Sequence, residues 1–142
     1  MNGVRTIRSV SVTQTGIPAI KKVQALLVDD SPRFLDAARR FLTTQAVDIV
    51  GEAHTGQEAL GLLDVLAPDL VLLDLELPDL DGLTVLPLIK ARPDAPRVII
   101  VTIHDQDEYR VAAVAAGADG FVPKRELTRA LVPLIRQLFD AV

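Results

Sequence analysis

The chain of 142 residues contains no cysteine, and aromatic residues make up only 4% of it. The lack of cysteine excludes disulfides, thiolate metal sites and thiol nucleophiles, and it is compatible with a reducing cytosol. With so few rings, the hydrophobic fraction of 49% must build a core from aliphatic side chains. Such a composition favours helices and strands packed in layers.

Long apolar runs are also missing from the sequence. No run approaches the length of a membrane span, and the N-terminus lacks the apolar centre of a signal peptide. We therefore expect a cytoplasmic protein with no membrane partner. The length is sufficient for one compact domain and too short for two.

Acidic residues are absent from residues 1–22, which contain four basic residues and so carry +4. The whole chain carries −4, and the difference leaves −8 on residues 23–142. An acidic body lacks the cations that bind phosphates, so we predict no direct binding of nucleic acid. We interpret residues 1–22 as an N-terminal extension, with at most a short edge strand near Val10 and Val12, and residues 23–142 as the domain proper.

Within that domain, short apolar runs alternate with segments of helical period. The runs predict strands over residues 24–28, 47–51, 70–73, 98–101 and 120–122, and the periodic segments predict helices over 32–42, 56–66, 83–90, 105–117 and 127–138. Five strand–helix units with right-handed crossovers predict an α/β fold, a doubly wound parallel sheet sandwiched by five helices.

Several helix boundaries have their own signals. Ser31 before Pro32 predicts a capped start, and Asp105 with Glu108 resembles a capping box. Gly117 is a candidate left-handed stop. Pro87 lies inside a predicted helix, where it removes a hydrogen bond, so we expect a late start or a kink there.

Polar residues stand where the predicted strands end. Asp74 follows residues 70–73, the pair Asp29 and Asp30 follows the first strand, Thr102 ends the fourth, and Lys124 follows the fifth. Since ligands bind at the carboxyl edge of open parallel sheets, we expect these side chains to converge there.

Three converging carboxylates repel one another unless a cation joins them. Oxygen donors without histidine or cysteine favour a hard cation, and Mg²⁺ fits best. A carboxylate beside Mg²⁺, with a hydroxyl and an ammonium nearby, is suited to accepting a phosphoryl group. We interpret Asp74 as the nucleophile and Lys124 as a group that neutralises the phosphoryl oxygens.

The motifs LLVDDS, LLDLELPDLDG, IIVT and AAGADGFVPK, in this order, resemble those of two-component response regulator receiver domains. The resemblance covers residues 23 to 140 and implies a flavodoxin-like fold. It implies that Asp74 is the phosphoacceptor, with Mg²⁺ bound by Asp30 directly, by Asp29 mostly through water and by the backbone carbonyl of Glu76.

The resemblance also implies roles for the residues at the ends of the fourth and fifth predicted strands. Thr102 would bond the phosphoryl group and move toward it, Lys124 would pair with it, and Phe121 would turn inward as the aromatic switch. In many members of the family a proline follows the lysine, whereas here Arg125 follows it and Pro123 precedes it. Glu76 and His104 occupy variable positions that tune hydrolysis in the family, although His104 is also interpretable as a solvated loop residue.

The partners that the resemblance implies are a sensor histidine kinase or a phosphotransfer protein. The face formed by residues 105–117, 120–122 and 127–138 would bind a second copy of the chain or a downstream protein. The pattern around Lys124 is similar to receivers of regulators with a LuxR-type DNA-binding domain, for which we expect no room before Val142. The favoured function is a signalling switch that catalyses only its own phosphorylation and dephosphorylation. The alternatives are a Mg²⁺-dependent aspartyl-phosphate phosphatase, with Glu76 as general acid, and a degenerate receiver that only binds protein.

Overall fold

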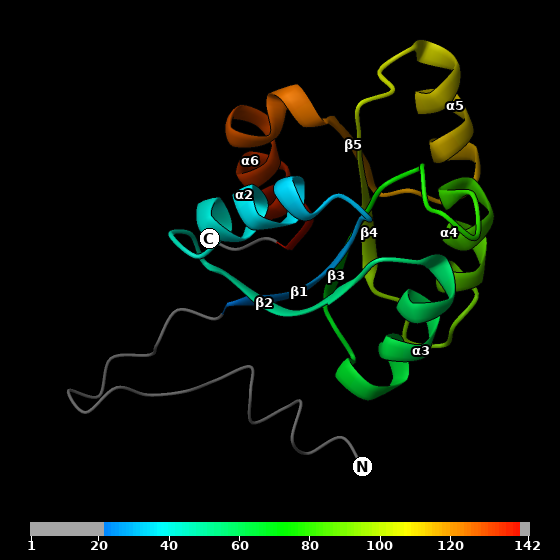
Figure 1. Cartoon of the computed structure of the whole chain (residues 1–142), viewed down its shortest axis with the longest axis horizontal. Helices are drawn as coiled ribbons and strands as arrows, with labels where there is room; N and C mark the ends of the chain where they lie inside the picture. Colours follow the sequence, from blue (N-terminus) through cyan, green and yellow to red (C-terminus); the bar gives the residue numbers. More distant parts are fainter. Residues whose placement is uncertain (1–21, 140–142) are drawn as a thin grey trace.

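The computed structural model describes residues 22–139 and contains one parallel sheet (Figure 1). The spatial order of the strands is β2-β1-β3-β4-β5, where β1 spans Val23–Val28, β2 Val47–Ala53, β3 Leu70–Leu73, β4 Arg97–Thr102 and β5 Gly120–Pro123. The chain moves from β1 outward to β2, then returns past β1 to β3. This reversal confirms the predicted doubly wound, flavodoxin-like sheet. The edge strand predicted near Val10 and Val12 lies outside the described residues.

Helices cover both faces of the sheet (Figure 1). One face is covered by α2 (Pro32–Leu42) and α6 (Leu127–Phe139), and the other by α3 (Gly56–Leu66), α4 (Gly82–Lys90) and α5 (Asp107–Ala115). A short 3₁₀ turn, η1 (Lys124–Glu126), joins β5 to α6. No helix within residues 22–139 combines the length and the apolar character needed to cross a bilayer.

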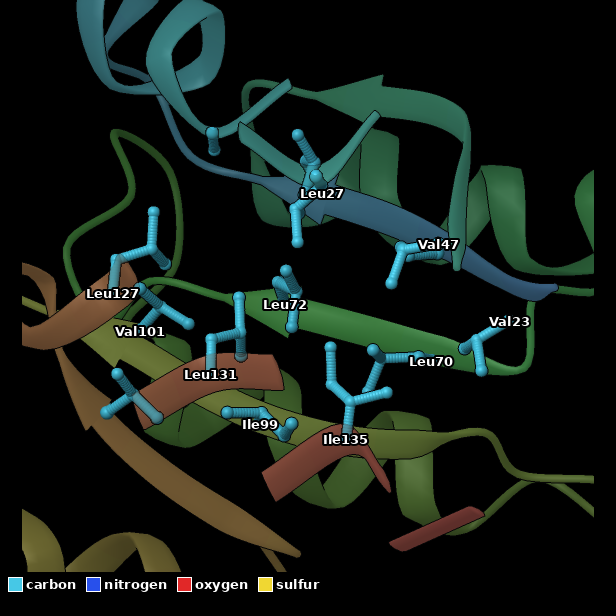
Figure 2. Packing of buried hydrophobic residues seen from close by; sticks show 14 of the residues in the cluster. Val23, Leu27, Val47, Leu70, Leu72, Ile99, Val101, Leu127, Leu131 and Ile135 are labelled. Carbon is cyan, nitrogen blue, oxygen red and sulfur yellow. The ribbon is translucent and has the colours of Figure 1, made fainter. Parts of the chain in front are cut away.

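The continuous apolar runs of the strands are explained by burial on both faces of the sheet. In β3, Leu70 and Leu72 pack toward α2 and α6, whereas Val71 and Leu73 pack toward α3, α4 and α5. Successive side chains of a strand point to opposite faces, so a strand covered on both sides is apolar at every position. Figure 2 shows the first of these two clusters, with Leu131 and Ile135 of α6 lying against the strands. This core holds the strand ends in fixed positions.

The start of α5 differs from the predicted one, and one of the two effects expected from Pro87 in α4 is not observed. α5 begins at Asp107 without a side-chain cap, because the carboxylate of Asp105 pairs with Arg125 rather than capping the helix. α4 begins at Gly82, without the late start expected from Pro87. The Asp81 side chain accepts from the backbone N–H of Leu83 at 2.9 Å, which fixes the first turn ahead of the proline.

Asp119, in the loop before β5, ties three segments together. Its carboxylate accepts from Lys90 Nζ at 2.9 Å, from Arg97 at 3.2 Å and from the backbone N–H of Val98 at 2.8 Å. Burial raises the pKa of Asp119, but the hydrogen bonds from Lys90 and Val98 and the charge of Lys90 outweigh it, so its pKa lies below the ordinary value. The ionised carboxylate therefore stabilises the fold.

We expect the substitution Asp119→Asn to lower the free energy of unfolding by about 1 to 2 kcal/mol near neutral pH, because both cations are partly exposed. The folded pKa lies below the unfolded value of about 3.9, so this stabilisation is present above that unfolded pKa and is lost as the pH falls through the folded pKa. Urea unfolding of both proteins should show a gap at neutral pH that closes in acid. The exposed Asp94→Asn is the control, and a gap that does not depend on pH would contradict the account.

Candidate functional site

Three carboxylates meet at the carboxyl edge of the sheet. β1 and β3 are neighbours in register, with Val28 opposite Leu73, so the residues that follow them, Asp29 and Asp74, are brought side by side. One carboxylate oxygen from each of Asp29, Asp30 and Asp74 lies within 4.8 Å of the others. Asp29 and Asp74 are buried, whereas Asp30 is exposed. The predicted acidic cluster is therefore assembled.

The acidic cluster brings together three carboxylates, and Lys124 supplies one ammonium against them. Burial raises the pKa of the Asp29 carboxyl above its ordinary value and the charge of Asp74 adds to the rise, although the Lys124 ammonium and the hydrogen bond from the Ser31 backbone oppose it. The Oδ2 atom of Asp29 is buried and accepts no hydrogen bond of good geometry. It contacts the Lys124 ammonium as an ion pair. An acidic cluster with such an oxygen fits an additional hard cation.

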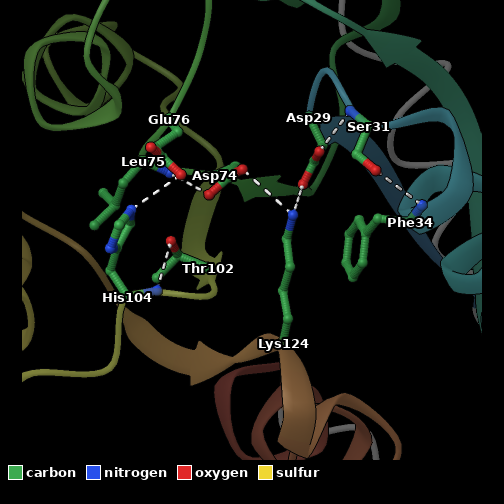
Figure 3. Close-up of polar contacts among 9 residues, drawn as sticks. All are labelled: Asp29, Ser31, Phe34, Asp74, Leu75, Glu76, Thr102, His104 and Lys124. Atoms are coloured by element: carbon green, nitrogen blue, oxygen red, sulfur yellow. Dashed lines mark hydrogen bonds and ion pairs between the residues drawn. The ribbon is translucent and has the colours of Figure 1, made fainter.

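Lys124 enters this cluster from the opposite side, at the end of β5 (Figure 3). Its Nζ atom lies 2.7 Å from Asp29 Oδ2 and 3.4 Å from Asp74 Oδ2, and its side chain is 15% exposed. Pro123 is the last residue of β5, and Lys124 opens the turn η1. The unusual order of proline and lysine therefore leaves the ammonium at the site.

Backbone groups fix the orientation of the two buried carboxylates. The N–H of Leu75 donates to Asp74 Oδ1 at 2.7 Å, and the N–H of Ser31 donates to Asp29 Oδ1 at 2.9 Å. Each carboxylate thus has one oxygen held by the chain, and the Oδ2 atoms of both face Lys124 (Figure 3). An Asp74 oxygen in this position can attack an incoming electrophile.

Thr102 and Phe121 lie on the β4 and β5 side of the site. The Thr102 side chain is fully buried, and its Oγ1 accepts from the backbone N–H of His104 at 3.3 Å. Phe121 is buried, with 8% of the residue exposed. The guanidinium of Arg110 lies 4.6 Å from the centre of that ring. The Arg110 guanidinium therefore covers one face of the Phe121 ring.

Glu76 and His104 form a pair near Asp74. His104 Nε2 lies 3.0 Å from a carboxylate oxygen of Glu76, and the His104 ring lies 4.9 Å from the ring of Tyr109. His104 therefore lies in a loop with its side chain 26% exposed and in contact with Glu76 and Tyr109. The Glu76 side chain is directed at His104, as Figure 3 shows.

Two contacts at the site were not predicted from the sequence. The ring of Phe34 lies 4.3 Å from Lys124 Nζ, and Arg110 covers Phe121. Phe34 reads in the sequence as one more apolar residue of a helix, and Arg110 as a solvated cation. Each contact joins residues of different elements, so no periodic spacing within one helix or strand signals it.

Known proteins are similar to this chain in sequence and in fold. The model of the response regulator receiver domain family matches residues 25–136. The nitrate/nitrite response regulator protein NarL of Escherichia coli K12 is 32% identical over 100 residues, which cover 70% of this chain and 46% of NarL. The DNA-binding transcriptional activator EvgA of the same strain is 32% identical over 104 residues, covering 73% of this chain and 51% of EvgA.

A solved structure is similar over most of its length. The two-component response regulator of the LuxR family from Aurantimonas sp. SI85-9A1 has a TM-score of 0.76 and 30% identity, covering 84% of this chain and 86% of that one. The chain spans about half the length of the curated relatives that it matches.

These relatives correct one prediction. The acidic charge of residues 23–142 led us to predict no direct binding of nucleic acid, yet a relative of comparable sequence is named as DNA-binding. The exclusion is wrong because the net charge of a receiver domain carries no information about other segments of a regulator. Taken with the sheet order and the acidic edge, the comparisons establish that the chain belongs to the response regulator receiver domain family of two-component signalling.

Proposed function

We propose that this receiver domain is a phosphorylation-gated switch, in which Asp74 accepts a phosphoryl group from a sensor histidine kinase or a phosphotransfer protein. One observation carries the proposal: the buried Asp74 carboxylate has two further carboxylates within 4.8 Å and the Lys124 ammonium at 3.4 Å. This combination of nucleophile, cation-binding acids and fixed positive charge is what transfer of a phosphoryl group to a carboxylate requires.

The transfer makes one bond and breaks another. An Asp74 oxygen attacks phosphorus, the bond from phosphorus to the imidazole nitrogen of the donor breaks, and the electron pair leaves with that nitrogen. The Lys124 ammonium, already between Asp29 and Asp74, balances charge on the phosphoryl oxygens. The domain would catalyse only this step and the later hydrolysis, and would not turn over outside substrates.

Asp29, Asp30 and Asp74 are the residues that would hold Mg²⁺, together with the backbone carbonyl of Glu76 that the family resemblance implies. Their all-oxygen donor set and the poorly paired Oδ2 of Asp29 support that choice. When bound, Mg²⁺ supplies the positive charge that brings phosphoryl oxygens and carboxylates together. The acceptance of a phosphoryl group is therefore expected to depend on the metal.

The output of the switch would follow from Thr102 and Phe121. A phosphoryl group on Asp74 offers acceptor oxygens to the Thr102 hydroxyl, whose Oγ1 now accepts from His104. Movement of Thr102 toward the phosphoryl group would change the packing beside Phe121, and so the surface that partners meet. The competing role as a phosphatase would require Glu76 as a general acid, but its carboxylate is paired with His104.

Intact mass spectrometry tests the proposal. Incubation of the chain with phosphoramidate or acetyl phosphate and Mg²⁺ should add the mass of one phosphoryl group, and chelation of the metal should slow this addition by about tenfold or more. A chain that gains no phosphoryl group, or gains it equally fast with chelator, would contradict the proposal. Turnover of an aryl phosphate would instead favour the phosphatase.

A further inference from the structure

The Lys124 ammonium has a third neighbour besides the two carboxylates. The ring of Phe34, from the first turn of α2, lies with its centre 4.3 Å from Lys124 Nζ, and Figure 3 shows the ring beside the end of the lysine side chain. An ammonium over an aromatic face is attracted by the negative charge of that face, more strongly when water is largely excluded. The Lys124 side chain is 15% exposed, so much of that water is excluded.

The position of Phe34 is set by the same turn that holds Asp29. The Ser31 side chain accepts from the backbone N–H of Phe34 at 3.3 Å, and the Ser31 backbone N–H donates to Asp29 Oδ1 at 2.9 Å. Ser31 therefore connects the carboxylate of Asp29 with the backbone of Phe34 on one side of the ammonium. Asp74 lies on the other side, at the end of a different strand.

Lys124 needs such support because its side chain is long. Ordering four rotatable bonds costs conformational entropy, and the nearer carboxylate, Asp29 at 2.7 Å, competes with Asp74 at 3.4 Å for the ammonium. A neutral ring attracts the ammonium without adding a third negative charge. The ring can thus hold the ammonium in place while leaving its N–H donors for oxygen acceptors.

We propose that Phe34 is a positioning residue for phosphoryl transfer, whose ring holds the Lys124 ammonium facing Asp74. This inference rests on the proposed function and acts through Lys124, because Phe34 itself touches no reacting atom. It predicts that an aromatic face at position 34 matters more than apolar volume.

Two substitutions separate the face from the volume. Phe34→Leu keeps an apolar side chain without a ring, and Phe34→Tyr keeps the ring. We expect phosphorylation by phosphoramidate with Mg²⁺ to slow by about fivefold to tenfold in Phe34→Leu and to remain within about twofold of wild type in Phe34→Tyr. Phe41→Leu is the matched control, since Phe41 is another half-buried ring of α2 packed against the same core cluster. It should lose stability without this loss of rate.

Nuclear magnetic resonance provides a readout that needs no phosphorylation. The Lys124 methylene protons next to Nζ should be shifted upfield by the Phe34 ring in wild type and in Phe34→Tyr, and should return to ordinary values in Phe34→Leu. Unshifted methylene protons in wild type would overturn the inference even if no phosphoryl group is accepted. Equal phosphorylation rates in wild type and Phe34→Leu would overturn it while the proposed function stands.

Discussion

Replacing Asp74 with asparagine is expected to abolish phosphorylation of the chain, with a loss of at least about a hundredfold in rate. The carboxamide is a poor nucleophile and removes one of the three carboxylates that would hold the cation. Its oxygen can still accept from the Leu75 N–H, as Asp74 Oδ1 does at 2.7 Å. The fold should therefore survive the change, and intact mass after incubation with phosphoramidate and Mg²⁺ measures the loss.

A measurement of unfolding and a control variant show whether the loss of phosphorylation comes from the missing carboxylate or from a damaged fold. Removing one of three repelling carboxylates should leave the free energy of unfolding unchanged or raise it by about 1 kcal/mol. The control is Asp48→Asn, which changes an exposed aspartate of β2 far from the acidic edge. It should be phosphorylated like wild type. A phosphoryl group that still appears undiminished in Asp74→Asn would show that another residue accepts it.

The substitution Gly82→Ala is expected to damage both stability and phosphorylation. A Cβ at Gly82 would lie 2.4 Å from the carbonyl oxygen of Asp74 and 2.7 Å from the Cα of Leu75, and both are backbone atoms that cannot turn away. The start of α4 or the backbone of Asp74 and Leu75 must therefore move. We expect a loss of about 3 kcal/mol in the free energy of unfolding. Because misplacing a reacting group by an ångström is costly, we also expect phosphorylation to slow by about tenfold to a hundredfold.

Gly61 provides the matched control, since it lies in the exposed middle of α3 and a Cβ there meets nothing within 4 Å. Gly61→Ala should raise the free energy of unfolding by about 0.5 to 1 kcal/mol, because alanine favours the helix and restricts the unfolded chain. Its phosphorylation rate should equal that of wild type. Urea unfolding and the rate of mass gain compare the two variants, and equal behaviour of Gly82→Ala and Gly61→Ala would contradict the close approach at Gly82.

The strands and the acidic edge could be predicted because their signals are local. Runs such as Leu70 to Leu73 are apolar at every position because both faces are buried, and each run stops at the residue that reaches the edge. Parallel strands bring their carboxyl ends together, so Asp29, Asp74 and Lys124 could be assigned to one site before their distances were known.

The errors and omissions arise where a contact with another residue, near or far in the chain, decides what the local pattern leaves open. Asp105 failed to cap α5 because Arg125, 20 residues later, pairs with it. Pro87 did not delay α4 because Asp81 had already fixed its first turn. The contact of Phe34 with Lys124 depends on how α2 and the end of β5 meet, which no local pattern encodes.

Locating the phosphoryl group tests the central claim most directly. Borohydride reduces an acyl phosphate on aspartate to homoserine, so treatment of the phosphorylated chain followed by peptide mapping identifies the acceptor. We predict homoserine at position 74, in the peptide that contains the end of β3, and only in samples exposed to both donor and Mg²⁺. Homoserine at position 29 or 30, or at a carboxylate away from the acidic edge, would contradict the account.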